Sequence, residues 1–143
     1  MLVRQILGQK GGTDVVTIQP GATVSDAARI LSENRIGALV VATDDRPEGI
    51  LSERDIVREL GRRGDACLKD TVDDLMTRKL VSCTPDEPTY SVLAKMTEGR
   101  FRHMPVMEGE AMVGLISIGD VVKARLSELS MEKNALEDMI KGF

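Results

Sequence analysis

A serine and an aspartate three positions apart occur twice in the chain, as Ser52-Glu-Arg-Asp55 and Ser117-Ile-Gly-Asp120. At a helix start the serine hydroxyl can accept the aspartate N–H, and the carboxylate can accept the serine N–H, so the motif can be a helix cap. The same position also offers backbone N–H groups to a phosphate, and a carboxylate there can accept hydrogen bonds from ribose hydroxyls. The residues therefore allow two interpretations, a structural cap or part of a nucleoside phosphate site.

Few other residues could perform chemistry. Cys83 and His103 could be imagined as a nucleophile and its base, but Cys83 lies in a predicted buried strand, where a thiol is usually inert. The sequence has no Walker-type phosphate loop, HExxH, Cys-x-x-Cys or Gly-x-Ser-x-Gly motif. We therefore expect a protein that is not an enzyme. Cys67 and Cys83 lack metal-ligand spacing, so we expect free thiols and no structural metal.

Composition narrows the possible partners and locations. The chain has 143 residues, 42% of them hydrophobic, a net charge of -4 and only 2% aromatic residues. This charge and the lack of stacking side chains argue against a nucleic-acid partner. No run approaches the roughly 18 apolar residues of a membrane span, and MLVRQILGQKGG lacks the apolar core and cleavage site of a signal peptide. We expect a cytoplasmic protein that is not inserted in a membrane.

The two Ser-x-x-Asp motifs belong to an internal duplication. With a shift of 65 residues, the segment from Val16 to Val57 aligns without a gap with the segment from Val81 to Val122. Substituted positions keep their apolar character, which is typical of a repeated structural unit. Upstream, 3–7 resembles 72–76, with four extra residues in the first copy that we assign to a loop at 9–12. Because a half-chain of this size is marginal alone, the halves are expected to share a core.

Each copy predicts the order strand, helix, strand, strand, helix. Short apolar strands are expected at 15–18 and 80–83, each followed by a proline. The first helix of each copy shows apolar residues at helical spacing, and Thr23 with Asp26 forms a possible capping box. Two hairpins follow, one with strands 38–42 and 49–51 around the turn 44–48, the other with strands 104–107 and 112–116 around 108–110. Their continuous apolar runs predict strands covered on both faces. The fold class is α+β.

The tandem order of Val-x-x-x-Pro, a helix, Arg-x-x-x-x-x-Val and Gly-apolar-apolar-Ser-x-x-Asp resembles a CBS-domain pair, the cystathionine-β-synthase-like Bateman module. The resemblance covers residues 1 to about 127, and the segments GRFRHMPV and GLISIGDVV are close to the usual sequence motifs of the family. It implies two β-α-β-β-α repeats, 1–66 and 67–127, related by a pseudo-two-fold axis, with a helical extension at 128–143. It also implies two clefts that commonly hold AMP, ADP, ATP, a dinucleotide such as NAD(H), or S-adenosylmethionine.

By this resemblance, each cleft draws on both repeats. The first cleft would contain Ser52, Arg54, Asp55, Cys83, Thr84, Arg102, His103, Met104 and Pro105. The second would contain Ser117, Asp120, Thr17, Ile18, Ile36, Gly37 and Ala38. The first gathers two arginines and the only histidine, which suits a phosphate through charge-assisted hydrogen bonds. The second has Gly119 in place of Arg54, so we expect it to be empty or to hold a less charged group.

The expected roles follow from these positions. Asp55 and Asp120 would hold ribose hydroxyls, and Ser52 and Arg54 would meet phosphate. Arg102 and His103 would neutralise the phosphate, while Met104 and the strand near Cys83 would enclose the adenine. A histidine on sequence alone is often only a packing or surface residue, and we interpret Arg35 and Arg100 as helix-terminal cations. The eight methionines are expected to fill gaps in the core.

Two functions from different classes remain. The first is a regulatory adenine-nucleotide sensor, with AMP preferred, that changes the arrangement of its repeats and so biases a separate effector protein. The second is a ligand-free interaction module whose Ser-x-x-Asp motifs are only caps. Since the chain ends close to the end of the module, no attached effector domain is expected.

The segment after residue 126 predicts an amphipathic helix with Leu129, Leu136, Ile140 and Phe143 on one face and Lys133 interrupting it. This helix could lie back on its own domain or join a dimer contact. Pairs of the resembled family commonly form a disc-like dimer through their helices, so we expect a homodimer whose contact the tail extends.

Overall fold

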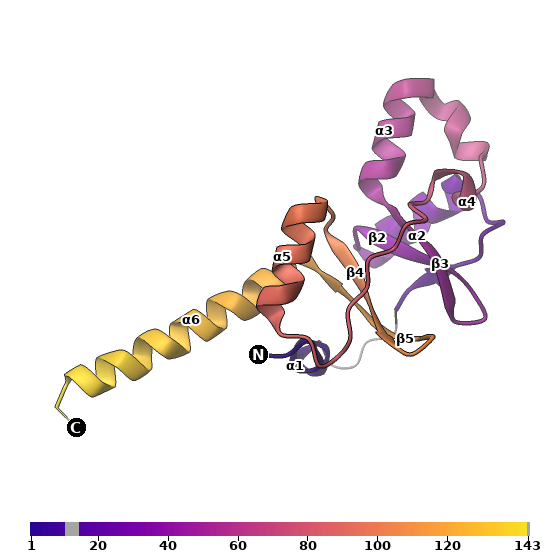
Figure 1. The fold of residues 1–143 in the computed structure, drawn as a ribbon. Coiled ribbons are helices and arrows are strands. Elements are labelled where there is room, and N and C mark those ends of the chain that lie inside the picture. The colour runs from indigo at the N-terminus through magenta and orange to yellow at the C-terminus, as the bar shows by residue number, and fades with distance from the viewer. Residues whose placement is uncertain (11–14, 143) are drawn as a thin grey trace. The chain divides into compact units, whose positions relative to one another are not determined.

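The computed structural model describes residues 1–10 and 15–142, and the duplicated order of elements is present in it (Figure 1). The first repeat contains β1 (Thr17–Ile18), α2 (Val24–Asn34), β2 (Ala38–Thr43), β3 (Arg46–Ser52) and α3 (Glu53–Arg63). The second contains α5 (Thr89–Gly99), β4 (His103–Glu108), β5 (Ala111–Ser117) and α6 (Ile118–Ile140). The connecting elements are α1 (Val3–Gln9), the 3-10 helix η1 (Gly64–Lys69) and α4 (Val72–Leu75). The α+β class is confirmed.

Two compact units divide the chain, and their bounds differ from those of the predicted repeats. One unit consists of Asp14–Val81 with Gly109–Met112, and we call it the first-repeat unit. The other, the second-repeat unit, consists of Met1–Thr13, Ser82–Glu108 and Val113–Phe143. The segment before the first repeat thus belongs to the unit of the second repeat, and η1 and α4 belong to the unit of the first. The predicted loop at 9–12 lies partly outside the described residues; Gln9 ends α1 and Lys10 caps it.

Equivalent hydrogen bonds hold the exchanged segments in place. In the first-repeat unit, the N–H of Val72 donates to the carbonyl of Ala22 over 2.8 Å. In the second-repeat unit, the N–H of Val3 donates to the carbonyl of Glu87 over 2.9 Å. Val3 and Val72 are both fully buried in their cores. Because a buried backbone donor must find a partner, these bonds fix each leading helix on the repeat of its unit.

The glycine that occurs in both copies of the duplicated motif has a packing role. A Cβ atom at Gly49 would lie 2.5 Å from the Met76 sulfur and 2.9 Å from the carbonyl oxygen of Thr77, and one at Gly114 would lie 2.6 Å from Leu7 Cδ2. Leu7 and Met76 are equivalent residues of the two leading segments. Each exchanged segment therefore crosses the strand of its unit at a distance that only a glycine permits.

Each unit has its own hydrophobic core, so the predicted core common to both halves is replaced by two cores, each of which takes residues from both halves of the sequence. In the first-repeat unit it contains Ile18, Val24, Ala27, Leu31, Leu39, Val41, Leu51, Ile56, Val72 and Met76. In the second-repeat unit it contains Val3, Ile6, Cys83, Val92, Met96, Met104, Val106, Ile116, Val121 and Ala124. The first five residues of β2 are all buried, which confirms the prediction of coverage on both faces for this strand, but Val113 in β5 is 44% exposed, so the prediction was wrong for β5. Three methionines, Met76, Met96 and Met104, lie in the cores as expected, whereas Met131 and Met139 are exposed.

The first strand of the second repeat was predicted at 80–83 but is reduced to one parallel bridge between Cys83 and Val106. In the first repeat, β1 pairs with β2 in parallel, and the N–H of Val40 donates to the carbonyl of Val16 over 3.3 Å. The residue equivalent to Val40 is Pro105, which has no N–H to donate. The prediction was wrong for this strand because the proline removes the hydrogen bond that would extend it.

The hairpin of the first repeat is tighter than predicted. Asp44 and Asp45 both have positive φ, 49° and 64°, as the two central residues of a type I′ turn require. Strand β3 therefore starts at Arg46, so residues 46–48, which were predicted to be part of the turn, belong to the strand: Arg46 and Pro47 pair with Thr43 and Ala42, and Glu48 lies at a β-bulge. The second hairpin turns at Gly109, with φ of 62°.

Candidate nucleotide-binding edges

Both Ser-x-x-Asp motifs form complete capping boxes. Ser52 Oγ accepts the N–H of Asp55 over 3.3 Å, and Asp55 Oδ2 accepts the N–H of Ser52 over 2.9 Å. Ser117 and Asp120 repeat these bonds at 3.1 Å and 2.9 Å. The predicted caps are confirmed, and both helices α3 and α6 begin at these serines. Thr23 also caps α2 by accepting the N–H of Asp26.

In the first-repeat unit, the predicted residues of both clefts gather at one edge of the sheet. Ala38, the first residue of β2, pairs with Ser52, the last residue of β3. The N–H of Glu53 donates to the carbonyl of Gly37 over 2.9 Å, which ties the start of α3 to the segment before β2. Strand β1 lies beside β2 in parallel. The structure thus brings together the following residues: Thr17, Ile18, Ile36, Gly37, Ala38, Ser52, Arg54 and Asp55.

The second-repeat unit has an equivalent edge. The N–H of Ile118 donates to the carbonyl of Arg102 over 2.8 Å, so the start of α6 lies next to the start of β4. Cys83 donates its N–H to Pro105 over 3.0 Å and accepts that of Met107 over 2.8 Å, which holds the first segment beside β4. This edge brings together the remaining predicted residues: Cys83, Thr84, Arg102, His103, Met104, Pro105, Ser117 and Asp120.

The two aspartates have different cationic neighbours. Asp55 is 7% exposed, and its Oδ1 accepts a hydrogen bond from Arg58 over 2.6 Å. Asp120 Oδ2 accepts a hydrogen bond from Lys10 over 2.9 Å, and the same ammonium reaches the carbonyl oxygen of Leu115 over 3.0 Å. Lys10 comes from the exchanged segment after α1. It was not among the predicted residues, because no local pattern indicates that residue 10 lies beside residue 120.

The environment of Asp120 favours its charged form. Burial raises the pKa of this carboxyl, but the hydrogen bond from the Ser117 backbone and the Lys10 ammonium outweigh burial, so its pKa lies below the ordinary value. The carboxylate is therefore a hydrogen-bond acceptor at neutral pH. Such a group can accept from a hydroxyl as well as from the cap.

Two arginines at these edges are available to bind an anion. Arg54 on α3 and Arg102 before β4 are both exposed, and neither forms an ion pair with another residue in the part of the chain that the structure describes. A guanidinium beside free helix N–H groups suits a phosphate, which it can meet with two parallel hydrogen bonds. His103 is half-buried in β4.

Cys83 is not suited to nucleophilic chemistry. It is a free thiol, 2% exposed, and its sulfur lies 3.8 Å from the carbonyl oxygen of Pro105. Burial raises its pKa to about 12, with a further contribution from Glu87 that Lys95 partly offsets. The thiol is therefore neutral at physiological pH, in agreement with the predicted inert residue. Cys67 is also a buried free thiol.

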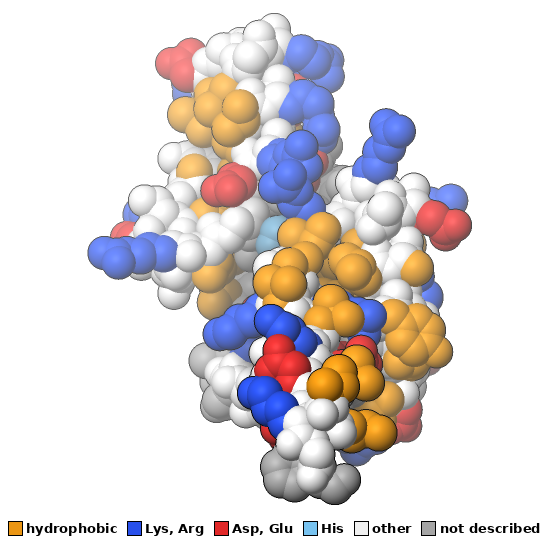
Figure 2. Space-filling model, turned by 90° about the vertical axis from the view of Figure 1, so that its left-hand side faces the viewer, with side chains coloured by type: hydrophobic (Ala, Val, Ile, Leu, Met, Phe, Trp, Pro, Cys, Tyr) orange, Lys and Arg blue, Asp and Glu red, His pale blue; other side chains and the backbone are white. Residues whose placement is uncertain are grey.

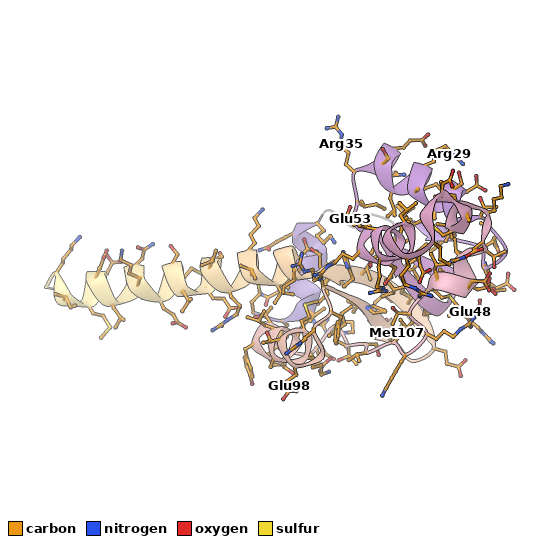
Figure 3. All side chains as sticks on the ribbon, turned by 90° about the horizontal axis from the view of Figure 1, so that it is seen from above. Arg29, Arg35, Glu48, Glu53, Glu98 and Met107 are labelled. Atoms are coloured by element: carbon orange, nitrogen blue, oxygen red, sulfur yellow. The ribbon has the colours of Figure 1, made fainter. Side chains whose placement is uncertain are left out.

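Arg35 and Arg100 end α2 and α5 in the left-handed conformation, with φ of 53° and 56°. The backbone N–H groups of both residues close the last helical turn. The Arg35 side chain points outward from the first-repeat unit (Figure 3). Both arginines thus terminate their helices, as predicted. Their left-handed backbone conformation was not predicted.

A shallow pocket of about 500 Å³ lies between α2 and α3 of the first-repeat unit. Most of its lining is apolar, with Arg35 and Glu53 as its charged residues, and its full lining is Ala28, Leu31, Ser32, Arg35, Ile36, Gly37, Glu53, Ile56 and Val57. Neither Ser52 nor Asp55 lines it. Of the predicted cleft residues, Ile36 and Gly37 do line it, so the pocket adjoins the polar edge but does not contain its capping box.

The described residues, 1–10 and 15–142, contain no cluster of three or more histidine, cysteine, aspartate or glutamate side chains that could hold a metal ion. Over the same residues, no helix is both long enough and apolar enough to cross a membrane.

Comparison with known proteins places this architecture in a family. The CBS domain profile matches residues 5–62 and 72–127. A mitochondrial CBS domain-containing protein of Arabidopsis thaliana is 36% identical over 125 residues, which are 84% of this chain and 61% of that protein. The chain thus spans less than two thirds of this relative.

Two solved structures have similar folds. A CBS-domain containing protein from Agrobacterium tumefaciens is 43% identical with a TM-score of 0.84, over 87% of this chain and 99% of that one. A CBS domain protein from Pyrobaculum aerophilum, solved in complex with AMP, is 26% identical with a TM-score of 0.78, over 92% and 99% of the two chains. The chain belongs to the CBS domain family and contains a tandem pair of these domains.

Proposed function

We propose that this CBS pair is a regulatory module that binds an adenine nucleotide, with AMP preferred, and transmits binding to a separate effector protein through a change in the arrangement of its repeats. The observation that carries the proposal is the duplicated polar edge. At each edge a capped helix start lies beside the start of a strand, with an exposed arginine, Arg54 or Arg102, free for an anion. The AMP complex of the Pyrobaculum relative supports the choice of ligand.

In this proposal the first cleft combines the arginine-bearing edges. Ser52 and Arg54 bind the phosphate, and Arg102 and His103 complete its neutralisation. Asp55 accepts the ribose hydroxyls, while Cys83, Thr84, Met104 and Pro105 enclose the base. The second cleft combines Ser117 and Asp120 with Thr17, Ile18, Ile36, Gly37 and Ala38. It has Gly119 where the first has Arg54, so it takes the less charged ligand, or none.

The proposed regulatory role requires self-association and a partner. Val57 on α3 and Val122 on α6 are 66% and 41% exposed, and such apolar helix surfaces support a homodimer formed through helices. No catalytic step is proposed, and ATP, ADP and NAD(H) are the alternative ligands. A cytoplasmic location is retained from the sequence prediction.

Thermal unfolding with AMP, ADP, ATP, NADH and S-adenosylmethionine tests this function. A ligand at about 100 times its Kd adds roughly 2.7 kcal/mol of stability, which should raise the Tm by about 2 to 8 °C. We expect AMP to give this shift with the wild type. Arg54→Gln and Arg102→Gln should reduce it, because each removes a charge-assisted hydrogen bond worth about 1.5 to 3 kcal/mol. Arg29→Gln, on an exposed face of α2, is the matched control and should respond as the wild type does.

Asp55→Ala should also abolish the shift, but it removes half of the capping box of α3 as well, namely the bond from the Ser52 N–H to the Asp55 carboxylate. Thr23→Ala removes the cap of α2 without touching the proposed site and separates the two effects. Since both boxes are complete without a ligand, the second candidate function is an interaction module in which they serve only as caps. If none of the five compounds moves the Tm of the wild type, that function is favoured, and affinity capture of partners becomes the appropriate experiment.

A further inference from the structure

The second half of α6 has an apolar face that its own chain does not cover. The helix continues without interruption from Ile118 to Ile140, and it extends beyond α1 and α5 of its unit (Figure 1). Only Val121 and Ala124 of this helix are buried. The large apolar residues further along are 49% to 82% exposed, namely Leu126, Leu129, Met131, Leu136, Met139 and Ile140.

Most of these residues form a regular stripe. Spacings of four and three residues alternate along the helix through the stripe residues Val122, Leu126, Leu129, Lys133, Leu136 and Ile140. This is the heptad pattern of a coiled-coil seam, interrupted by one lysine. In Figure 2, hydrophobic side chains lie along one side of the projecting end of α6 and charged side chains along the other. The pattern continues to Ile140, beyond the family match that ends at residue 127.

The stripe is distinct from the face by which α6 packs in its own unit. On that packing face, Glu128 accepts a hydrogen bond from Thr89 of α5 over 2.8 Å and is held by Arg125 over 2.7 Å. Val121 and Ala124 lie on the same side and are buried. Because residues at 121, 124 and 128 follow one helix face and residues at 122, 126 and 129 the next, anchoring of α6 leaves the stripe free for another helix.

The charges beside the stripe favour one orientation for a second copy. In a parallel, in-register pair, Lys133 would face the partner's Lys133, and Glu132 would lie beside the partner's Glu137, so like charges would meet along the seam. In an antiparallel pair, Leu129 faces the partner's Ile140 and Lys133 faces the partner's Leu136. The flanking positions then place Glu132 near the partner's Met139 and Ser130 near the partner's Glu137, without like-charge pairs.

We propose that the stripe of α6 binds the same stripe of a second copy in antiparallel orientation. The contact is self-complementary, as a two-fold interface requires. The single lysine fixes the register at the cost of some affinity, and its ammonium, 3.9 Å from Glu137 of its own helix, keeps a neutralising partner. This pairing deepens the proposed self-association and needs no ligand.

Analytical ultracentrifugation of two matched variants tests whether the stripe is the interface. Leu136 and Met131 are 60% and 61% exposed on the same helix, but only Leu136 belongs to the stripe. Leu136→Ala should weaken self-association at least about a hundredfold, because it removes two buried leucine side chains per pair and adds no charge opposite the partner's Lys133. Met131→Ala should leave the association constant within about threefold of the wild type. Circular dichroism of both variants checks that the helix is retained.

Disulfide cross-linking tests the orientation. Leu129→Cys and Ile140→Cys are made as separate chains, each alone and mixed, with the wild type as control because its two cysteines are buried. An antiparallel pair cross-links in the mixture and not in either chain alone. Cross-linking of Ile140→Cys alone would show parallel pairing and overturn the proposal.

The remaining outcomes also decide the question. If Leu136→Ala dissociates the protein but no mixture cross-links, the stripe binds another surface, such as the groove between α2 and α3, and the antiparallel pairing is wrong. If Leu136→Ala behaves as Met131→Ala does, the tail is not an interface. In both cases the nucleotide-dependent Tm shift is unaffected, so the proposed ligand-binding function is judged separately.

Discussion

Asp55 and Asp120 show how one residue type can serve structure and function at the same position. Each carboxylate completes a capping box, which requires no ligand, yet each also lies at an edge with a free helix start. Sequence reasoning could predict the caps because their bonds join residues three apart. The cation beside Asp55 is easier to predict from sequence than the cation beside Asp120. Arg58 is one helical turn from Asp55, whereas Lys10 reaches Asp120 from 110 positions away.

The cap at Asp120 makes stability depend on pH. Its folded-state pKa lies below the ordinary value of 3.8, so the stabilisation is complete above that value and is lost as the pH falls through the lower folded-state pKa. Asp120→Asn keeps an oxygen that can accept the Ser117 N–H but loses the charge that strengthens this bond and the bond from Lys10, so it should cost on the order of 1 kcal/mol at pH 7 and much less at pH 2. Urea unfolding at both pH values, at constant ionic strength, measures the difference.

Asp138→Asn, an exposed carboxylate on the same helix, is the control for general charge effects. A cost for Asp120→Asn that is equal at both pH values would contradict the argument, because it would show that the ionised carboxylate is not the stabilising form.

At the scale of helices and strands, the spacing of serine and aspartate determines where α3 and α6 begin, whereas backbone geometry determines how the two repeats differ. Serine and aspartate spacing correctly predicted where α3 and α6 begin. The missing first strand of the second repeat depends on a single absent N–H at Pro105, and the sequence contains that information only if the strand pairing is already known. The sequence does not indicate the left-handed conformation at Arg35 and Arg100, since glycine or asparagine, and not arginine, is typical at that position.

The two hairpin turns provide a matched pair for a test. Asp45 occupies the second central position of its turn with φ of 64°, a conformation that glycine adopts at lower cost. Asp45→Gly should therefore stabilise the protein by about 0.5 kcal/mol, the steric gain less the added entropy of the unfolded chain. Glu110 is the equivalent residue of the second turn and has no positive φ.

Glu110→Gly should thus destabilise by about 0.5 to 1 kcal/mol. Chemical unfolding of both variants under one condition compares them directly. If Asp45→Gly were as destabilising as Glu110→Gly, the first hairpin would not have the type I′ geometry described above.

At the scale of the whole molecule, the duplication could be predicted but the exchange of leading segments could not. Repeated residues reveal that two copies exist, and the apolar pattern of 3–7 and 72–76 reveals that each copy is preceded by a similar segment. Nothing in these patterns states which copy each segment covers, because the contacts join residues far apart in sequence. The compact units of the structure show which repeat each segment joins: α1 belongs to the unit of the second repeat, and α4 belongs to the unit of the first.

The exchange predicts a nonlocal effect of mutations in α1. Ile6 is 3% exposed in the core of the second-repeat unit, so Ile6→Ala should destabilise that unit by about 2 to 5 kcal/mol. Hydrogen exchange should show the loss of protection at 82–108 and 113–140, with protection at 15–81 less affected. Gln9→Ala, an exposed site on the same helix, is the control. A loss of protection confined to 15–81 would contradict the exchanged arrangement.

The exchange also has a consequence for the order of events during synthesis. Residues 1–10 are synthesised before the strands and helices of the second repeat, with which α1 forms one unit. The first-repeat unit, by contrast, needs only the chain through α4, apart from the tip of the second hairpin. Nascent chains should therefore acquire structure in 15–81 before the partner of α1 has been made, and the second repeat becomes stable only when α1 packs against it. Because each unit takes its leading segment from the other side of the midpoint, the chain cannot be divided there into two halves that fold independently.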